Sequence, residues 1–246
     1  MSIPRVLVGV TLLCAACFCV LLLARVTPEF AWVLGPIFTV PMVSLFEWLT
    51  HGVMYHRPLP GLEKIRKIHV GGHHGSLFPP RSYTRQGTYS FMRFREPLTP
   101  WQMSDNLADS LLTSGSQVAL HFAMGIVPIL LPAWWVTGSV SFLVSTIVSL
   151  AFLSYLLAYV HGCIHNPQGR WVERQGWFQW LDRHHYIHHI DQDANINFLL
   201  PLCDLLLGTR KPALTAQEAA DNPSFEEAKP LAWDVGGAKA FSVAPR

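Results

Sequence analysis

The histidines of this chain carry its clearest chemical signal. Ten of the twelve histidines fall into four short groups with the patterns H-x4-H, H-x3-HH, H-x3-H and H-x2-HH. Their members are His51, His56, His69, His73, His74, His161, His165, His185, His188 and His189. Side chains three or four residues apart lie on one face of a helix. Each group can therefore direct two or three imidazoles at one point, and imidazole is a common ligand of iron, zinc, copper and nickel.

The number of histidines predicts two metal ions. Structural zinc takes four ligands and catalytic zinc about three, so ten histidines exceed the coordination shell of one ion. Two ions with about five protein ligands each fit the count. His184 is an alternative ligand to His185, because it lies four residues before His188. Glu47 lies one helical turn before His51, and we expect it either to hold a ligand imidazole or to be a charged group at the membrane edge.

The composition excludes an ordinary soluble domain. Half of the residues are hydrophobic and only 14% are charged, with a mean hydropathy of +0.27, whereas about a quarter of a typical soluble domain is charged. The net charge of +2 gives no reason to expect a nucleic-acid partner. The five cysteines form no disulfide pattern, since three of them lie within one apolar run.

Four apolar runs predict an all-helical integral membrane protein. The runs cover residues 6–24, 30–49, 118–135 and 140–160, and each is close to the roughly 20 residues that a membrane-spanning helix needs. Short connections join them into two hairpins. The apolar segment 199–207 is too short to span, and we expect it at the membrane interface.

The predicted domain organisation is a single membrane-embedded domain over residues 1–211. Segments 51–115 and 161–211 would form a histidine-rich cap outside the bilayer. The remaining residues, 212–246, are rich in Ala, Pro and Glu and have no periodic pattern. We expect this tail to be loosely ordered.

Topology and charge both place the four histidine groups on one side of the membrane. Two hairpins return the chain to the side from which it started, and all four groups follow the returning helices. Seventeen of the 18 Lys and Arg residues fall on that side, and only Arg25 falls on the other. The positive-inside rule makes this side cytoplasmic, together with both termini. The compact chain favours a bacterial inner membrane over the endoplasmic reticulum.

Two other kinds of histidine-rich membrane protein fit the sequence less well. A bis-histidine haem protein needs paired histidines deep in facing helices, whereas these histidines lie at helix ends and in doublets. A transporter needs polar groups along a path through the membrane, and the apolar runs offer little beyond His121. A protein that binds or moves metal without catalysing a reaction remains the alternative to an enzyme.

The order of the hairpins and histidine groups resembles the fatty acid hydroxylase/sterol desaturase superfamily. Asn197, Pro201, Asp204 and Gly208-Thr209 are similar to the closing N-(Y/F)…P-x-(W)-D-x-(L/F)-F-G-T segment of that family. Cys203 and Leu207 replace aromatic residues that are common there, so no subfamily is assigned. The resemblance covers about residues 40–210.

This resemblance implies a membrane-bound di-iron oxygenase that uses O2 to hydroxylate an unactivated C–H position of a lipid, such as a fatty acyl chain or a sterol. A lipid desaturase with the same site is the alternative. The implied ligands are the ten histidines, with His185 rather than His184 in the last group. Asn197 and Asp204 would hold the ligating side chains in place, and no separate catalytic acid or base is assigned.

Iron is the expected metal, and zinc can replace it in isolated protein. The lipid would enter from the bilayer, and electrons would come from a separate donor protein.

Overall fold

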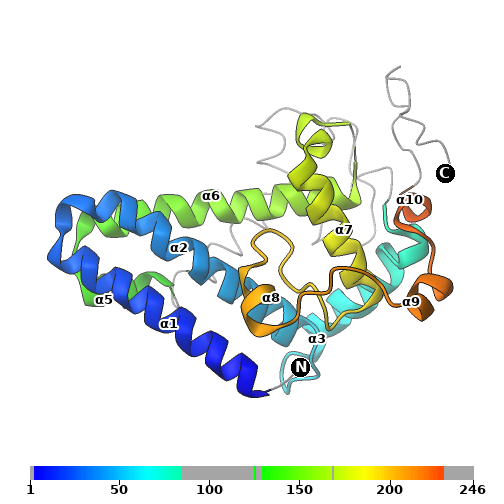
Figure 1. Ribbon diagram of the computed structural model, residues 1–246, viewed down its shortest axis with the longest axis horizontal. Coiled ribbons are helices and arrows are strands. Elements are labelled where there is room, and N and C mark those ends of the chain that lie inside the picture. Colours follow the sequence, from blue (N-terminus) through cyan, green and yellow to red (C-terminus); the bar gives the residue numbers. More distant parts are fainter. Residues whose placement is uncertain (1–2, 85–124, 126–128, 168, 230–246) are drawn as a thin grey trace.

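A computed structural model describes residues 3–84, 125, 129–167 and 169–229, and these residues form helices and no strands (Figure 1). The all-helical prediction is therefore confirmed for this part of the chain. The helices are α1 (Ile3–Val26), η1 (Pro28–Phe30), α2 (Ala31–Glu47), η2 (Trp48–Tyr55), α3 (Glu63–Arg66), η3 (Lys67–Leu77), η4 (Pro80–Ser82), α5 (Leu131–Thr137), α6 (Val140–His165), η7 (Trp171–Arg174), α7 (Gly176–Ile190), α8 (Leu202–Leu207), α9 (Ala216–Asp221) and α10 (Phe225–Ala228).

Within the described residues, three helical segments are long and apolar enough to cross a membrane, as is typical of a membrane protein. They are Ile3–Val26, Pro28–Tyr55 and Val140–His165. Their outer faces expose large apolar side chains such as Leu7 and Phe152, as helices in contact with lipid do. The predicted run 118–135 falls mostly outside the described residues, and its described end contributes to the short helix α5. His121 also lies outside them.

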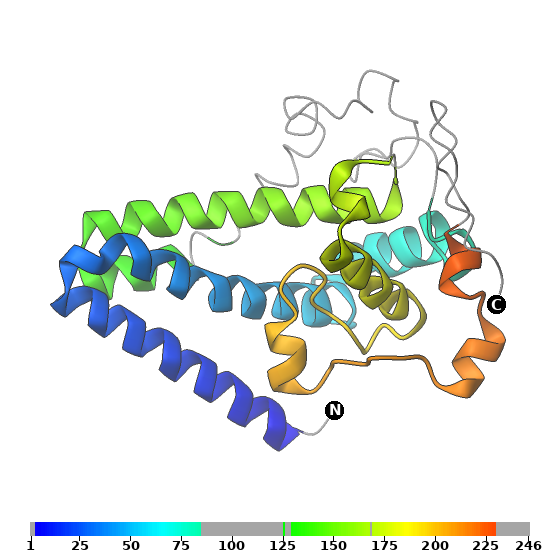
Figure 2. The same cartoon turned by 45° about the horizontal axis from the view of Figure 1, so that its top comes forward.

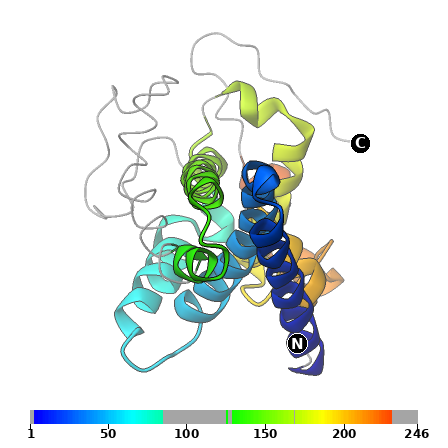
Figure 3. The ribbon, with the colours of Figure 1, turned by 90° about the vertical axis from the view of Figure 1, so that its left-hand side faces the viewer.

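The long helices lie side by side, with the histidine-bearing elements at one end. The chain reverses between α1 and α2 and again between α5 and α6, and both reversals lie at the opposite end of the bundle (Figures 1 and 2). Figure 3 shows the bundle from that end. At the second reversal, Gly138 ends α5 with a φ of 59°, a conformation that glycine adopts without strain. Ser139 then caps α6 by accepting a hydrogen bond from the Phe142 amide.

Two prolines, Pro36 and Pro41, lie inside α2 without ending it. A proline inside a helix leaves the carbonyl four residues earlier without its amide donor. For Pro36 this is the carbonyl of Trp32, and the Ser145 hydroxyl of α6 donates to it at 2.7 Å. Ser145 also lies against Gly35, where a Cβ atom would come within 2.5 Å of the serine oxygen. The close contact between α2 and α6 therefore satisfies the backbone group that the proline frees.

Two elements that follow α2, namely η2 and η3, are π-helical. η2 continues directly from α2, and η3 continues from α3. A π-helix has i→i+5 hydrogen bonds and occurs often at functional sites. Both π-helices carry histidines, so their geometry bears on the site described below.

The C-terminal region differs from the loosely ordered tail that we expected. Residues 212–229 include α9 and α10, while residues 230–246 lie outside the described part of the chain. Each helix begins with a capping box, formed by Thr215 with Glu218 and by Ser224 with Glu227. These reciprocal hydrogen bonds satisfy free amides at the helix start. They explain how two short helices form without an extended hydrophobic period.

Candidate metal centre

The structure gathers nine of the ten predicted ligands into two buried groups. Group A consists of His51, His56, His69, His74 and His188. Group B consists of His73, His165, His185 and His189. Within each group the candidate ligand nitrogens lie within 4.8 Å of one another, and all nine side chains are buried. The chain can therefore hold two metal ions in all-histidine surroundings, as the histidine count predicted.

Two elements, η3 and α7, contribute to both groups. Each histidine doublet is divided between the groups. His74 belongs to group A and His73 to group B; His188 belongs to group A and His189 to group B. The groups are consequently close, with the rings of His74 and His189 only 4.2 Å apart between centroids. Each doublet in the sequence thus supplies one histidine to each of the two neighbouring groups.

The π-helical geometry explains how histidines five residues apart meet. In an α-helix, side chains five positions apart differ by about 140° in direction. In η2, which ends beside His56, the i→i+5 hydrogen bonds of a π-helix put such residues about one turn apart. The rings of His51 and His56 are accordingly 5.0 Å apart, and those of His69 and His74 in η3 are 4.8 Å apart. A straight α-helix would have separated both pairs.

Backbone carbonyls fix the orientation of four imidazoles. The Nδ1 atoms of His51, His188, His165 and His189 lie 2.6–2.9 Å from the carbonyl oxygens of Ile196, Ala194, Tyr83 and Phe78, respectively. A carbonyl oxygen can only accept, so each Nδ1 carries the proton and each Nε2 carries the lone pair. His56 has the same arrangement with the Gln192 side-chain oxygen, at 3.2 Å. Such hydrogen bonds are typical of metal-ligating histidines.

The Nε2 atoms are spaced as ligands of a common ion would be. Nitrogens bound to one ion at about 2.0–2.1 Å lie about 2.9–3.4 Å apart. The Nε2 atom of His69 is 3.0 Å from that of His51 in group A, and the Nε2 atom of His185 is 3.1 Å from that of His165 in group B. The buried Nε2 atoms of His56, His188 and His73 have no hydrogen-bond partner. A buried polar atom without a partner is costly, and a bound cation would satisfy these atoms.

Electrostatics keeps the candidate ligands in the neutral form that binds metal. Burial lowers the pKa of His56 to about 4. Burial is also the main cause, and neighbouring imidazoles a further cause, of pKa values well below 6.5 at His69, His73, His74, His185, His188 and His189. At neutral pH these side chains need lose no proton before they bind an ion.

His161, the tenth predicted ligand, lies beside group B without belonging to it. It is half-buried, one helical turn before His165 in α6. Its ring centroid is 5.0 Å from that of His73 and 5.1 Å from that of His185. His161 therefore faces the open side of group B, where it would be a fifth histidine.

His184 lies outside both groups and has a different role. Its Nε2 atom is 2.9 Å from the Asn197 carbonyl oxygen and 3.1 Å from a carboxylate oxygen of Asp204. Asp204 also accepts hydrogen bonds from the amides of Ile196 and Asn197 and from the Thr209 hydroxyl, at 2.6–3.0 Å. This network holds the backbone whose Ile196 carbonyl orients His51. Asp204 and Asn197 thus support group A through the backbone.

Glu47 acts on the same loop, and not on an imidazole as we expected. Its carboxylate accepts hydrogen bonds from the Phe198 amide at 2.8 Å, the Leu199 amide at 3.4 Å and the Asn197 side chain at 3.3 Å. Glu47 is 5% exposed. A carboxylate that satisfies free amides of an irregular loop fixes the path of that loop. Of the two roles expected from the sequence, the contact with an imidazole is replaced by hydrogen bonds to this loop.

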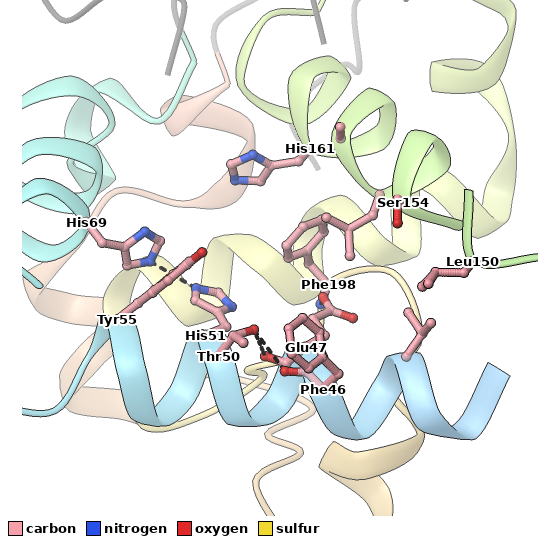
Figure 4. Close-up of a pocket in the computed structure, with 13 residues that line it drawn as sticks. Phe46, Glu47, Thr50, His51, Tyr55, His69, Leu150, Ser154, His161 and Phe198 are labelled. Atoms are coloured by element: carbon pink, nitrogen blue, oxygen red, sulfur yellow. Dashed lines mark hydrogen bonds between the residues drawn. The ribbon is translucent and has the colours of Figure 1, made fainter. Parts of the chain in front are cut away.

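A cavity lies between α2 and α6 and reaches the histidines (Figure 4). Most of its wall is apolar, with Val43, Phe46, Leu150, Leu157 and Ala158 among the lining residues. His51, His69 and His161 line one end of the cavity, and the Phe198 side chain lies beside them. The Phe198 ring is 4.8 Å from the His161 ring and 6.1 Å from the His51 ring. The cavity therefore leads from the membrane-spanning segments to the candidate metal centre.

Several residues that orient the ligands had no signal in the sequence. Phe78, Tyr83, Ala194 and Ile196 act through backbone carbonyls, so their side-chain types do not reveal the role. Gln192 uses its side chain, but a single glutamine near a histidine group is common. Only the fold could identify these residues.

Comparison with protein-family models, with curated proteins and with solved structures finds no match for this chain.

Proposed function

We propose that this protein is a membrane-bound dimetal oxygenase that hydroxylates an unactivated C–H position of a lipid. The observation that carries the proposal is the apolar cavity between α2 and α6 that ends at two adjacent all-histidine groups. A desaturase would use the same site, and the experiment below distinguishes the two reactions.

Iron is the metal that we propose, and the residues suit it. Neutral imidazoles bind iron, and they also bind zinc and copper. Iron is preferred because cleavage of an alkyl C–H bond needs oxidising power that amino-acid side chains do not have. Bound iron would supply this power together with O2. Group A and group B would each hold one ion, and His161 would complete group B.

The protein would position the ligands, exclude water from the site and give the lipid access to it. The carbonyls that orient the imidazoles would hold the ligand geometry rigid. The buried setting would keep water from the reacting positions. The wall formed by Phe46, Leu150 and Leu157 would accept an alkyl chain, and Phe198 would direct it toward the space between the groups. We assign no catalytic acid or base.

The proposed topology has four membrane-spanning helices in two hairpins. The histidine groups and both termini would be cytoplasmic, because the positive charges lie on that side. A separate electron-donor protein would then meet the cap from the cytoplasm, and the lipid would enter from the bilayer. Reporters fused after Arg246 and inserted at Thr137 should report opposite sides of the membrane. Reports from the same side would contradict this topology.

The reaction is tested with purified protein loaded with ferrous iron, a reducing system, a lipid extract and 18O-labelled O2. A hydroxylase incorporates one labelled oxygen atom into a lipid, whereas a desaturase leaves a new double bond without label. The His188→Ala variant is the matched negative control, because it lacks a ligand of group A. Absence of both products over a broad lipid panel, combined with metal flux in proteoliposomes, would instead establish a metal-transport protein.

A further inference from the structure

The chain after α9 returns to cover the outer side of α7. We call residues 223–229, which include α10, the C-terminal arm. The Tyr186 hydroxyl of α7 donates to the Pro223 carbonyl at 2.5 Å. The ring of Phe225 lies 5.6 Å from that of Tyr186 and 6.4 Å from that of Tyr83. The arm is therefore packed against α7 and Tyr83, on the side of α7 that Figure 1 shows facing α10.

A buried ion pair fastens the end of the arm. The Lys229 ammonium contacts a carboxylate oxygen of Asp182 in α7, and the two side chains are only 11% and 2% exposed. The ammonium also lies 5.6 Å from the centre of the Phe178 ring. A buried carboxylate that loses its cation becomes an uncompensated charge. Docking of the arm therefore compensates the buried charge of Asp182.

Asp182 connects this ion pair to group B. The Tyr83 hydroxyl donates to the carbonyl and to the carboxylate of Asp182, at 3.1 and 3.2 Å. The Tyr83 carbonyl in turn orients His165 at 2.9 Å. The Tyr83 ring packs 5.0 Å from the His165 ring and 5.1 Å from the His189 ring. A continuous set of contacts thus runs from Lys229 to two ligands of group B.

Other residues hold the ligands of group A in place. The carbonyls of Ala194 and Ile196 orient His188 and His51, and the Asp204 network holds the Ile196 backbone. Neither carbonyl belongs to the path through Lys229, Asp182 and Tyr83. The two groups share η3 and α7 but have separate outer supports.

We propose that the C-terminal arm positions group B, so that docking of Lys229 on Asp182 controls the affinity of one of the two metal sites and leaves the other unchanged. This inference rests on the proposed binding of two metal ions. Lys229 and Tyr83 are positioning residues in it, because they act through His165.

The test is a cobalt(II) titration of the full-length protein in detergent. The visible absorption of the bound cobalt measures binding at each step. His56→Ala and His165→Ala identify which absorption belongs to each group. Wild-type protein should bind two ions. Changes around ligating histidines typically lower metal affinity 10–100-fold, and we expect Lys229→Met to lower the affinity of group B about tenfold while group A changes less than threefold. Arg183→Met is the matched control, because it removes an exposed ion pair between α7 and Glu226 of the same arm.

Three further variants distinguish an effect on the position of the group B ligands from a general loss of folded structure. Lys229→Arg should restore the affinity of group B, Tyr83→Phe should weaken group B alone, and Asp204→Asn should weaken group A alone. Equal loss at both sites in Lys229→Met and Tyr83→Phe, or no loss at either, would overturn the role of the arm while leaving the metal centre intact. If Lys229→Met does not fold, Tyr83→Phe decides the question. Wild-type protein that binds no cobalt would overturn the proposed metal centre itself, and the inference with it.

Discussion

His73 and His74 are adjacent in the sequence, and their imidazole planes lie at 89° to each other with ring centroids 5.0 Å apart. His73 faces group B and His74 faces group A. One peptide unit of η3 therefore joins the two groups. In the proposed oxygenase, this connection would keep two bound ions at a short separation.

Single substitutions in this doublet should remove different metals. We expect His74→Ala to lose the ion of group A and His73→Ala to lose the ion of group B, because each change takes one nitrogen from one site. Metal analysis of the purified variants should give about one ion per chain in each case. The double variant should retain neither ion. Identical spectra for the two single variants after cobalt loading would contradict the division of the doublet.

Asp204 should be essential for stability. Its carboxylate is fully buried and accepts from two amides, a hydroxyl and the His184 ring. Asp204→Ala removes the acceptor of the two amides and the hydroxyl, and we expect a loss of at least about 3 kcal/mol in the free energy of unfolding. Denaturant titration in detergent measures it. Asp193→Ala is the control, since its ion pair with Arg57 is exposed and should contribute less than about 1 kcal/mol.

Filling the cavity should block the substrate without removing metal. Ala158 lines the cavity and is 2% exposed, so Ala158→Phe should occupy the space that we assign to the alkyl chain. We expect lipid product to fall at least tenfold while metal content stays at the wild-type value. Val148→Phe, on the exposed side of the same helix, should leave product formation unchanged. Full activity of Ala158→Phe would exclude this cavity as the lipid path.

Acid should destabilise the metal-free protein through its buried histidines. In the unfolded chain these groups have a pKa of about 6.5, whereas burial lowers the pKa of His56 to about 4 in the folded protein. Above pH 6.5 the groups are neutral in both states and contribute no pH dependence. As the pH falls from 6.5 toward 4, the unfolded chain binds more protons and the folded state loses stability. The melting temperature should therefore fall over this window, and His56→Gln should make the fall less steep. A constant melting temperature would contradict the assignment.

The sequence was sufficient to predict the membrane helices that are described and the set of histidines that converge. Long apolar runs and clustered ligands are signals that do not depend on details of the fold. The capping boxes of α9 and α10 were also readable, as Thr-x-x-Glu from Thr215 and Ser-x-x-Glu from Ser224. Short capped helices such as these need no extended hydrophobic period, so its absence does not predict a loosely ordered segment.

Other features could not be predicted from the sequence. Spacings of three and four residues indicate α-helices, and nothing in the residues around His51 or His69 indicates a π-helix. Whether His184 or His185 faces the other histidines depends on the rotation of α7, which packing determines. The contact of Glu47 with the Phe198 amide joins residues 151 positions apart. A pairing of this kind is a property of the folded chain alone.

The distribution of ligands along the chain has a consequence for biosynthesis. Five of the candidate ligands precede residue 75, and the other five lie between His161 and His189. About 115 residues separate His74 from His189, so a ribosome at 5–20 residues per second needs about 6–23 s to bridge them. During this interval the nascent chain presents an incomplete set of imidazoles to every metal ion in its surroundings. If the proposed metal centre forms, loading of both groups would therefore follow the synthesis of α7, which carries the last three candidate ligands.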